Sequence, residues 1–207
     1  MKPGQKFRNA LKNNKPLIIP GTINAYSAKL AELANHNSIY LSGSGVAAAS
    51  YGLPDLGVTT LENVLIDAKR ITSATSLPLL VDIDTGWGDF DAISNTIIEM
   101  GNANVAAVHI EDQIFDKRCG HRPNKQLVSI DEMQDRLKAA LDAKIDDSFF
   151  IMARTDALAS EGIEKAIERC GKYLDVGADG IFFEAAVSIE EYKAVSYTHL
   201  TLPTSHC

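Results

Sequence analysis

The sequence lacks any uninterrupted apolar run that approaches the ~18 residues needed to span a membrane. It has only three cysteines, Cys119, Cys170 and Cys207. Their odd number and wide spacing indicate reduced thiols in a cytoplasmic protein rather than a disulfide framework. The net charge is −7, so the chain also lacks the basic excess of a general nucleic-acid-binding protein. These absences favour a cytoplasmic protein that binds neither membranes nor nucleic acids.

Acidic residues are absent from the first 31 positions, and the first one is Glu32. A basic leading segment can be a transit peptide. This segment is poor in serine and arginine and runs directly into an apolar stretch, so we interpret it as part of the folded domain. Hydrophobic residues make up 45% of the chain and charged residues 23%, which is typical of a globular protein.

Short apolar stretches alternate with longer segments in which Leu, Ile, Ala and Met recur at helical spacing. Six stretches are predicted strands: residues 16–23, 38–43, 77–84, 105–112, 149–156 and 180–185. Repeated strand–helix units predict a parallel sheet that is buried on both faces. Three helix starts carry a capping box, in which a hydroxyl residue precedes a glutamate by three positions. These pairs are Thr59 with Glu62, Ser129 with Glu132, and Ser188 with Glu191.

Two α/β architectures fit this pattern, a doubly wound open sheet and a (β/α)8 TIM-type barrel. Polar residues recur where strand after strand ends: Thr22, Asn24, Ser42, Asp82, Asp84, Glu111, Asp112, Arg154, Asp156 and Glu184. A barrel brings the carboxyl ends of all its strands around one mouth, whereas an open sheet concentrates ligand groups at one switch point. No GxGxxG follows the first strand. The sequence therefore predicts a barrel.

The number of units is smaller than a complete barrel requires. About six units are present where a barrel has eight, and barrels usually need ~250 residues. We therefore interpret residues 1–195 as an incomplete barrel domain, truncated after about six units. Residues 196–207, SYTHLTLPTSHC, show neither helical nor strand periodicity. We interpret them as a non-native tail, and a genuine irregular terminus is the alternative.

Asp82 and Asp84 are the first candidate site residues. They are two positions apart on a predicted strand, so both carboxylates point to the same face. A hard divalent cation would relieve their repulsion, and all-oxygen ligands suit Mg2+, or Mn2+, better than zinc. Ordinary helix capping or loop solvation is the alternative, since two aspartates at this spacing are a weak motif.

Glu111 is the second candidate. His109 and Glu111 share one face of their strand, and Asp112 points to the other. Glu111 could hold a metal-bound water or orient a cation. A plain salt bridge to Arg118 or Arg154 is the alternative.

Arg154 and the LSGSG segment, residues 41–45, could both hold an anion. Arg154 suits bidentate binding of a substrate carboxylate, and a structural pair with Glu184 is the alternative. The LSGSG segment offers backbone N–H groups and hydroxyls, but no Gly-Lys-Ser/Thr follows, so it is not a Walker loop. It could cradle a carboxylate, or it could be a tight turn that needs glycine.

The segment FDKRCGHRPNK, residues 115–125, surrounds one thiol with cations. Zinc needs four ligands, and no second Cys/His pair at zinc spacing joins Cys119 and His121. Nearby cations lower the pKa of a thiol from ~8.5, which suits proton transfer by Cys119 near neutral pH. A solvated basic loop with an incidental cysteine is the alternative.

Five motifs occur together, in one order. They are YLSGSGVAAASYGLPDLG, LLVDIDTGWGD, HIEDQ, KRCGHRPNK and IMARTDALA. Together they resemble the isocitrate lyase and phosphoenolpyruvate mutase superfamily, and the resemblance extends over residues 17–195. It implies a (β/α)8 barrel, dependence on Mg2+, and reversible carbon–carbon cleavage of a small tricarboxylate to pyruvate and succinate. It also implies a cytoplasmic homotetramer.

The resemblance assigns roles to individual residues. Metal binding is implied for Asp82 and Asp84. Substrate binding is implied for Ser42, Gly43, Ser44, Gly120, Arg154 and Glu184. From the chemistry of such a cleavage, we expect Cys119 to be the acid that protonates the carbanion left by bond cleavage, and Glu111 and His121 to be further catalytic residues.

Two departures from the superfamily bear on activity. Ser44 stands where the superfamily commonly has a glycine. The last strands, which carry further substrate ligands, and the C-terminal helices that exchange between subunits are missing. We therefore expect the 207-residue chain to be inactive. The alternatives are isocitrate lyase or another member such as a 2-oxoacid decarboxylase or phosphonate mutase, and a non-catalytic barrel fragment.

Overall fold

A parallel β-sheet forms the centre of the molecule. In the computed structural model, which describes residues 1–115 and 125–197, its strands are β1 (Ile39–Leu41), β2 (Leu79–Asp82), β3 (Ala107–Glu111), β4 (Phe150–Thr155) and β5 (Gly180–Phe183). They lie side by side in the order in which they occur in the chain. A doubly wound sheet reverses its order at a switch point, so the sequential order confirms the barrel prediction.

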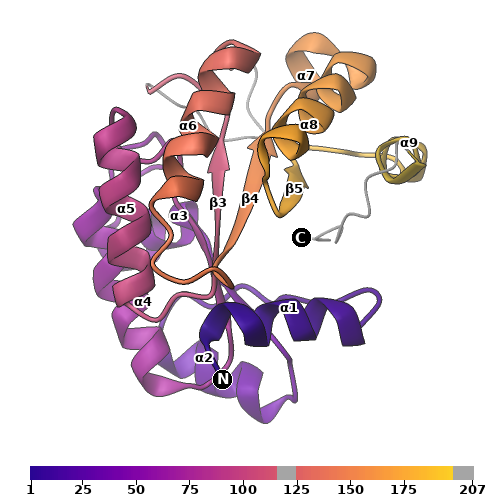
Figure 1. Ribbon diagram of the computed structural model, residues 1–207. Coiled ribbons are helices and arrows are strands. Elements are labelled where there is room, and N and C mark those ends of the chain that lie inside the picture. Colours follow the sequence, from indigo (N-terminus) through magenta and orange to yellow (C-terminus); the bar gives the residue numbers. More distant parts are fainter. Residues whose placement is uncertain (116–124, 198–207) are drawn as a thin grey trace.

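Helices cover the outer face of this sheet, as Figure 1 shows. The helices are α1 (Pro3–Asn13), α2 (Ala25–Leu33), α3 (Gly43–Gly45), a π-helical turn (Val46–Ser50), α4 (Leu61–Ala74), α5 (Phe90–Asn102), α6 (Ile130–Asp142), α7 (Leu158–Glu161), α8 (Ile163–Val176) and α9 (Ile189–Tyr197). Successive outer helices contact one another, α2 with α4, α4 with α5, α5 with α6, and α6 with α8. Of these described helices, none combines the length and apolar character required to cross a bilayer.

Alternate residues along the strands enter two separate apolar clusters. The larger cluster lies between the sheet and the outer helices and includes Val81, Ile110 and Ile151. The smaller one includes Leu80, Phe150, Met152 and Phe182, which belong to the opposite face of the same strands. Because successive side chains on a strand point to opposite faces, both sides of the sheet are buried, as the near-continuous apolar strands predict.

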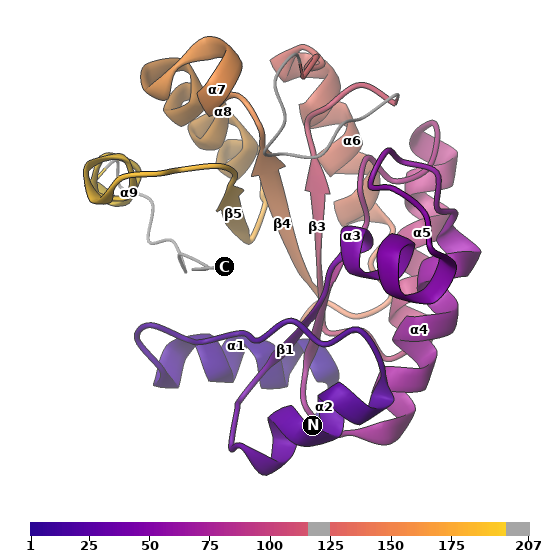
Figure 2. The ribbon, with the colours of Figure 1, turned by 180° about the vertical axis from the view of Figure 1, so that it is seen from behind.

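Helix α1 closes the end of the sheet at which the strands begin (Figures 1 and 2). Phe7 is 1% exposed and packs edge-on against Phe150 at 5.2 Å between ring centroids. Arg8 Nε donates to the carbonyl of Ser148 at 2.9 Å. A Cβ added at Gly4 would lie 2.2 Å from the same carbonyl oxygen, so only glycine allows this close approach. Helix α1 is therefore an integral part of the fold.

The first predicted strand, residues 16–23, is not a strand in the structure. Only an isolated parallel bridge, Gly21 with Tyr40, joins this segment to β1. Pro16 and Pro20 carry no N–H group, so they cannot donate to a strand ladder. The segment runs beside β1 but lacks the continuous hydrogen bonding of a strand.

The predicted helix start at Thr59 is wrong by one residue. Helix α4 is capped by Thr60, whose hydroxyl accepts from Asn63 N–H while Asn63 Oδ1 accepts from Thr60 N–H. Thr59 is buried, and its carbonyl accepts a hydrogen bond from Trp87 Nε1 at 2.8 Å. That contact holds Thr59 outside the helix, so the cap falls on the next hydroxyl.

The other predicted caps have the expected residues. Ser188 Oγ accepts from Glu191 N–H, and Glu191 Oε2 accepts from Ser188 N–H, which confirms a full capping box. Ser129 caps α6 by accepting from Glu132 N–H at 3.1 Å. The Glu132 side chain instead pairs with Arg136 at 2.7 Å. Of the predicted tail, residues 196–197 belong to α9, and residues 198–207 lie outside the described residues.

Candidate active site

Charged side chains gather on the inner face of the sheet, opposite the outer helices, at the carboxyl ends of its strands. They come from β2, β3, β4 and β5, from the residues that directly follow these strands, and from the segment that precedes α6. All are buried: Asp82, Asp84, Glu111, Lys125, Arg154, Asp156 and Glu184. In this set the five carboxylates outnumber the two cations. Burial of a carboxylate is unfavourable unless a cation or a hydrogen-bond donor compensates it.

Asp82 and Asp84 converge on one point beside Gly43. A Cβ built on Gly43 would lie 3.2 Å from Asp82 Oδ2 and 3.2 Å from Asp84 Oδ1. Asp84 N–H donates to Asp82 Oδ1 at 3.0 Å, and Asp84 has a φ of 49°, a conformation that aspartate tolerates better than most residues. The strand thus ends in a turn that brings both carboxylates together.

This geometry fits a divalent cation with oxygen ligands. Mg2+ is typically held by one or two carboxylates and completes its octahedron with water and substrate oxygens. Within residues 1–115 and 125–197, no cluster of three or more His, Cys, Asp and Glu side chains forms a metal site. The two carboxylates beside Gly43 match the one or two that Mg2+ typically takes from a protein.

His109 lies behind Asp82, in the interior of the sheet. Its ring stacks between Tyr40 and Phe182, at 5.7 and 4.6 Å between centroids. Its Nε2 is hydrogen-bonded to the Tyr40 hydroxyl at 2.9 Å, and its Nδ1 lies 3.7 Å from Asp82 Oδ1. His109 and Glu111 share one face and Asp112 the other, as the strand spacing predicts.

Arg154 lies at the centre of the carboxylates. Its Nε is 3.0 Å from Asp156 Oδ2 and 3.3 Å from Glu111 Oε2, and its Nη2 is 3.6 Å from Glu184 Oε2. The guanidinium also lies over the ring of Phe182, 5.5 Å from its centroid. Burial disfavours the charge of Arg154, but these carboxylates outweigh burial and raise its pKa well above the usual value. Both predicted contacts, with Glu111 and with Glu184, are present, and Asp156 is the closer partner.

Asp156 joins Arg154 to a second buried cation. Asp156 Oδ1 lies 2.9 Å from Lys125 Nζ, and both side chains are almost fully buried. Burial alone would raise the pKa of Asp156, but Arg154 and Lys125 reverse the effect and lower it. The Asp156 carboxylate is therefore ionised at neutral pH and holds both cations.

Asp112 supports this arrangement from the outer face of the sheet. Its carboxylate accepts hydrogen bonds from the Thr155 hydroxyl at 2.7 Å, the Tyr173 hydroxyl at 2.8 Å and the Asp156 backbone N–H at 2.9 Å. Arg169 Nη1 lies 3.6 Å from the same carboxylate. Burial raises the pKa of Asp112, and the three hydrogen bonds oppose that shift. Asp112 thus ties the end of β4 to helix α8.

The LSGSG segment forms a short helix instead of a tight turn. The Gly43 N–H donates to Asp82 Oδ2 at 3.2 Å. The hydroxyls of Ser42 and Ser44 are hydrogen-bonded to each other at 2.8 Å, and Ser44 is exposed. Ser44 is not among the residues with positive φ, so its backbone suits a non-glycine residue. Gly43 is needed because two carboxylates approach its Cα, which sequence reasoning did not foresee.

Three predicted site residues, Cys119, Gly120 and His121, lie outside the described residues. Lys125 is the first described residue after them. Sequence reasoning missed Lys125, and it placed Asp112 and Asp156 at strand ends without assigning them a role. The spacing of Arg154 and Asp156 was the available signal, because residues two apart on a strand share a face.

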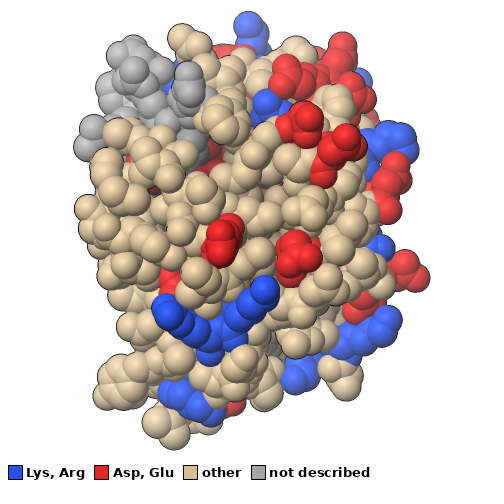
Figure 3. Space-filling view, turned by 90° about the vertical axis from the view of Figure 1, so that its left-hand side faces the viewer, with Lys and Arg blue, Asp and Glu red and all other residues tan. Residues whose placement is uncertain are grey.

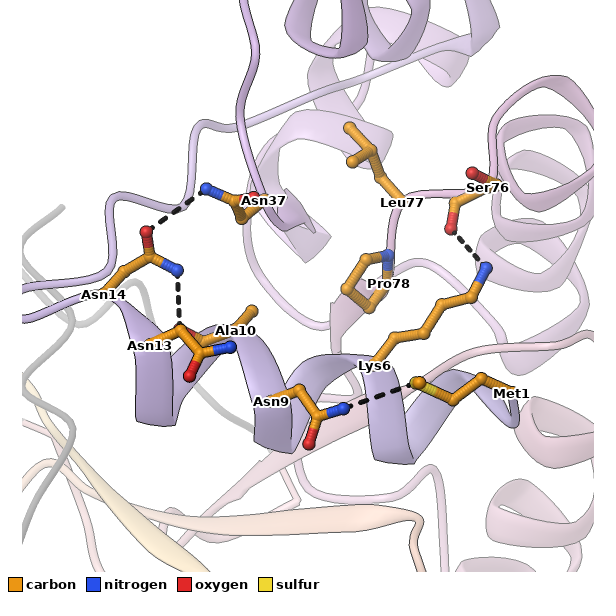
Figure 4. Close-up of a pocket in the computed structure, with 10 residues that line it drawn as sticks. All are labelled: Met1, Lys6, Asn9, Ala10, Asn13, Asn14, Asn37, Ser76, Leu77 and Pro78. Carbon is orange, nitrogen blue, oxygen red and sulfur yellow. Dashed lines mark hydrogen bonds between the residues drawn. The ribbon is translucent and has the colours of Figure 1, made fainter.

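A cleft at the opposite end of the sheet is a different kind of feature. It has a volume of about 430 Å3 and lies between α1 and the segments that precede β1 and β2 (Figure 4). Asn14 Nδ2 donates to the carbonyl of Ala10, Asn37 Nδ2 donates to Asn14 Oδ1, and Lys6 Nζ donates to the carbonyl of Ser76. These three donors are satisfied within the chain, as expected of a structural region.

The surface over α4 and α5 differs in charge from the candidate site. Figure 3 looks onto the side of the molecule where α4 and α5 lie, and most of that face is uncharged. Apolar side chains on these helices, Ile66 and Ile98, are partly exposed.

Cys170 is a buried thiol on α8 and is not in a disulfide. Burial, together with the charge of Asp112, raises its pKa to about 12. A thiol with this pKa is almost entirely protonated at neutral pH, so Cys170 is a packing residue.

Comparison with known proteins identifies the family. The family model described as phosphoenolpyruvate phosphomutase matches residues 7–203. The chain belongs to the phosphoenolpyruvate phosphomutase family. This family is the one that the five ordered motifs resemble, and its members generally depend on a divalent metal.

Individual relatives of this family are lyases and hydrolases. The 2-methylisocitrate lyase of Shewanella oneidensis is 60% identical over 190 residues, which are 92% of this chain and 65% of that protein. The chain thus spans just under two thirds of the length of this curated relative. A crystal structure of 2,3-dimethylmalate lyase superposes with a TM-score of 0.91 at 35% identity, over 98% of this chain and 69% of that one.

A phosphonopyruvate hydrolase solved with oxalate and Mg2+ superposes with a TM-score of 0.84 at 32% identity, over 96% of this chain and 69% of that one. The first of these structures belongs to the phosphoenolpyruvate mutase and isocitrate lyase superfamily, whose members have a TIM-type barrel. The sequential parallel sheet of this chain is part of that fold.

Proposed function

We propose that this chain is the barrel portion of an Mg2+-dependent carbon–carbon lyase that cleaves 2-methylisocitrate to pyruvate and succinate, a reaction of propionate breakdown. The observation that carries the proposal is the convergence of Asp82 and Asp84 beside Gly43, next to the buried Arg154. The 60% identity to a 2-methylisocitrate lyase supports the choice of substrate.

The described residues would bind the substrate through its carboxylates. Asp82 and Asp84 would hold the Mg2+, and Mn2+ could replace it because both ions prefer oxygen ligands. When bound, the ion would supply positive charge for the substrate hydroxyl and a neighbouring carboxylate. Arg154 would bind a second carboxylate through its guanidinium, with Glu184 beside it. Ser42, Gly43, Ser44 and Gly120 would complete the substrate contacts.

The cleavage would be of the retro-aldol type. Loss of the hydroxyl proton turns the alcohol carbon into the carbonyl of pyruvate as the carbon–carbon bond breaks. The electron pair of that bond remains on the succinate half, which then needs a proton. Cys119 would donate it, assisted by His121 and by the neighbouring cations that lower the pKa of a thiol. Glu111, 3.3 Å from Arg154, would keep the arginine in place during the reaction.

Other members of the family are the competing functions. One methyl group in a pocket changes selectivity by only ~1–3 kcal/mol, so isocitrate is a close rival substrate. A 2-oxoacid decarboxylase or phosphonate mutase would share the metal site and Arg154. The cysteine of KRCGH favours a lyase, because bond cleavage leaves a carbanion that needs an acid.

Pyruvate release from 2-methylisocitrate tests the proposal, with Mg2+ and with a chelator in its place. The assay is run on the 207-residue chain and on the same chain extended to the full length of its curated relatives. We expect Mg2+-dependent release from the extended version. Release of glyoxylate from isocitrate, with no pyruvate from 2-methylisocitrate, would overturn the substrate assignment. No turnover of either compound would favour a non-catalytic role.

Cys119→Ser tests the assignment of the acid. A serine hydroxyl is a much weaker acid than a thiol among cations, so turnover should be lost while substrate binding persists. Cys170→Ser is the matched control, since that thiol is buried in the outer core. Full activity of Cys119→Ser would remove Cys119 from the mechanism.

We also propose a cytoplasmic homotetramer, which rests on the family resemblance. Sedimentation of the extended version would test the assembly. A monomer at all concentrations would contradict it.

A further inference from the structure

Asp156 contacts Arg154 in a way that the other carboxylates do not. Both of its carboxylate oxygens are used, Oδ2 on Nε at 3.0 Å and Oδ1 on Nη2 at 3.3 Å. Glu111 and Glu184 lie within ion-pair distance, at 3.3 and 3.6 Å. A two-point contact along one edge fixes the plane of a guanidinium, whereas a single contact lets it rotate.

The contact with Asp156 occupies one edge of the Arg154 guanidinium, the edge formed by Nε and Nη2. In the described part of the chain, the hydrogen bonds of Arg154 use only Nε and Nη2. Arginine has five N–H donors. Of these, the Nη1 group has no hydrogen bond within the described residues, and Nη2 has only Glu184, at 3.6 Å, beside its second hydrogen. A small dicarboxylate would fit this second edge.

Asp156 is itself held from two directions. Lys125 Nζ contacts its Oδ1 at 2.9 Å, and the exposed fractions of the two side chains are 1% and 0%. Its backbone N–H donates to Asp112, which also accepts from the hydroxyls of Thr155 and Tyr173. Burying an ammonium ion is costly, so a fully buried lysine on this carboxylate indicates that the position of Asp156 matters.

We propose that Asp156 is a positioning residue, which holds one edge of the Arg154 guanidinium so that the other edge receives a substrate carboxylate. Lys125 and Asp112 fix Asp156 in turn. This inference rests on the proposed function in one respect, since it takes Arg154 as the carboxylate-binding residue. It adds three residues that the binding of a dicarboxylate depends on without contact to the substrate.

Oxalate in the presence of Mg2+ is the probe that tests the proposal, because it is a dicarboxylate that does not require turnover. Its dissociation constant is measured by calorimetry on the extended version and on its variants Asp156→Asn, Arg154→Lys and the double variant. Asp156→Asn should weaken oxalate binding ~10–100-fold, the usual cost of removing a group that orients a ligand-binding residue. When Arg154→Lys is already present, Asp156→Asn should raise the oxalate dissociation constant by less than about a further threefold. The effects of two coupled residues are not additive.

Two further variants separate positioning from folding. Asp156→Asn removes the carboxylate that pairs with the buried ammonium group of Lys125, and this loss could unfold the protein. Lys125→Met combined with Asp156→Asn removes both charges, so the melting temperature should recover while oxalate affinity stays low. Asp135→Asn is the matched control, because Asp135 is exposed on α6, and it should leave oxalate affinity unchanged.

The outcomes distinguish this proposal from the proposed function. A folded Asp156→Asn variant that binds oxalate within about threefold of wild type would overturn it, as would additive losses with Arg154→Lys. If oxalate affinity recovers in the combined Lys125→Met and Asp156→Asn variant, Asp156 contributes to folding and does not position Arg154. Wild-type protein that binds oxalate but releases no pyruvate would refute only the proposed substrate. Wild-type protein that binds no oxalate would refute both the proposed function and the positioning role of Asp156.

Discussion

The two ends of the sheet differ in how their polar groups are satisfied. At the amino end, amide and ammonium groups donate to carbonyls of the chain itself, as Asn14 does to Ala10 and Lys6 does to Ser76. At the carboxyl end, the carboxylates of Asp82 and Asp84 converge beside Gly43. The first arrangement is complete within the protein. The second favours the binding of a cation, which is why we assign stability to one end and function to the other.

The apolar layers show the same division. Phe7 of α1 packs against Phe150 at the beginning of β4. At the other end of β4, Arg154 lies over Phe182 and is surrounded by acids. A single strand thus contributes packing at its first residue and charge near its last. Substitutions at the two ends should therefore have different consequences.

The largest expected effect is on stability, from Phe7→Ala. Removing a buried ring from a packed cluster typically costs ~3–5 kcal/mol. Urea unfolding should show this loss, while Mg2+ affinity under folded conditions stays near the wild-type value. Phe90→Ala is the control, since Phe90 is 46% exposed and its loss should cost little. A large loss of Mg2+ affinity in Phe7→Ala would break the division between the two ends.

Asp82→Asn should have the next largest effect, on turnover. Removing one charged ligand from a site that stabilises a developing negative charge costs on the order of 10²–10³ in rate. The free energy of unfolding should fall little or even rise, because a buried repulsion disappears. Steady-state pyruvate release and urea unfolding of the extended version check both parts. Turnover that remains within a few-fold of wild type would remove Asp82 from the site.

Gly43→Ala should weaken Mg2+ binding about tenfold, which is ~1.4 kcal/mol. The added methyl would lie 3.2 Å from a carboxylate oxygen of both Asp82 and Asp84, so the carboxylates must move apart. Gly171→Ala is the matched control, because a Cβ there has no atom within 4 Å. Calorimetric titration compares the two. Equal Mg2+ affinities would show that the two carboxylates do not hold the ion beside Gly43.

The smallest effect concerns pH. The pKa of Asp156 is lowered in the folded protein, so its ion pairs stabilise the fold above the unfolded pKa of ~3.9 and lose that contribution as pH falls through the folded value. The destabilisation caused by Asp156→Asn should therefore be greatest near neutral pH and shrink below about pH 4. Urea midpoints at several pH values measure it, with Asp135→Asn as control. A difference that grows on acidification would contradict the sign of the shift.

Much of the fold could be predicted because strand periodicity is local. The alternation of His109, Glu111 and Asp112 between two faces is confirmed, as is the barrel order of the strands. The predicted strand at residues 16–23 was wrong because two prolines remove ladder donors. The cap at Thr59 was wrong because a tertiary hydrogen bond from Trp87 holds that residue, and no local pattern reports such a contact.

The site could be predicted only in part. Asp82, Asp84, Glu111, Arg154 and Glu184 were predicted from their positions at strand ends, and the structure brings them together. The contact of Lys125 with Asp156 joins residues 31 apart, and that of Tyr173 with Asp112 joins residues 61 apart. Such pairs depend on how the segments that follow β3 and β4 pack against each other and against α8, so sequence spacing carries no signal for them.

Mg2+ titration by isothermal calorimetry tests the central claim most directly, because it requires neither turnover nor the correct substrate. We predict one Mg2+ per chain in the wild type, loss of that binding in Asp82→Asn, and no change in Asp135→Asn. Wild-type protein that binds no Mg2+, or Asp82→Asn that binds it with unchanged affinity, would contradict the assignment of the carboxyl end as the metal-dependent site.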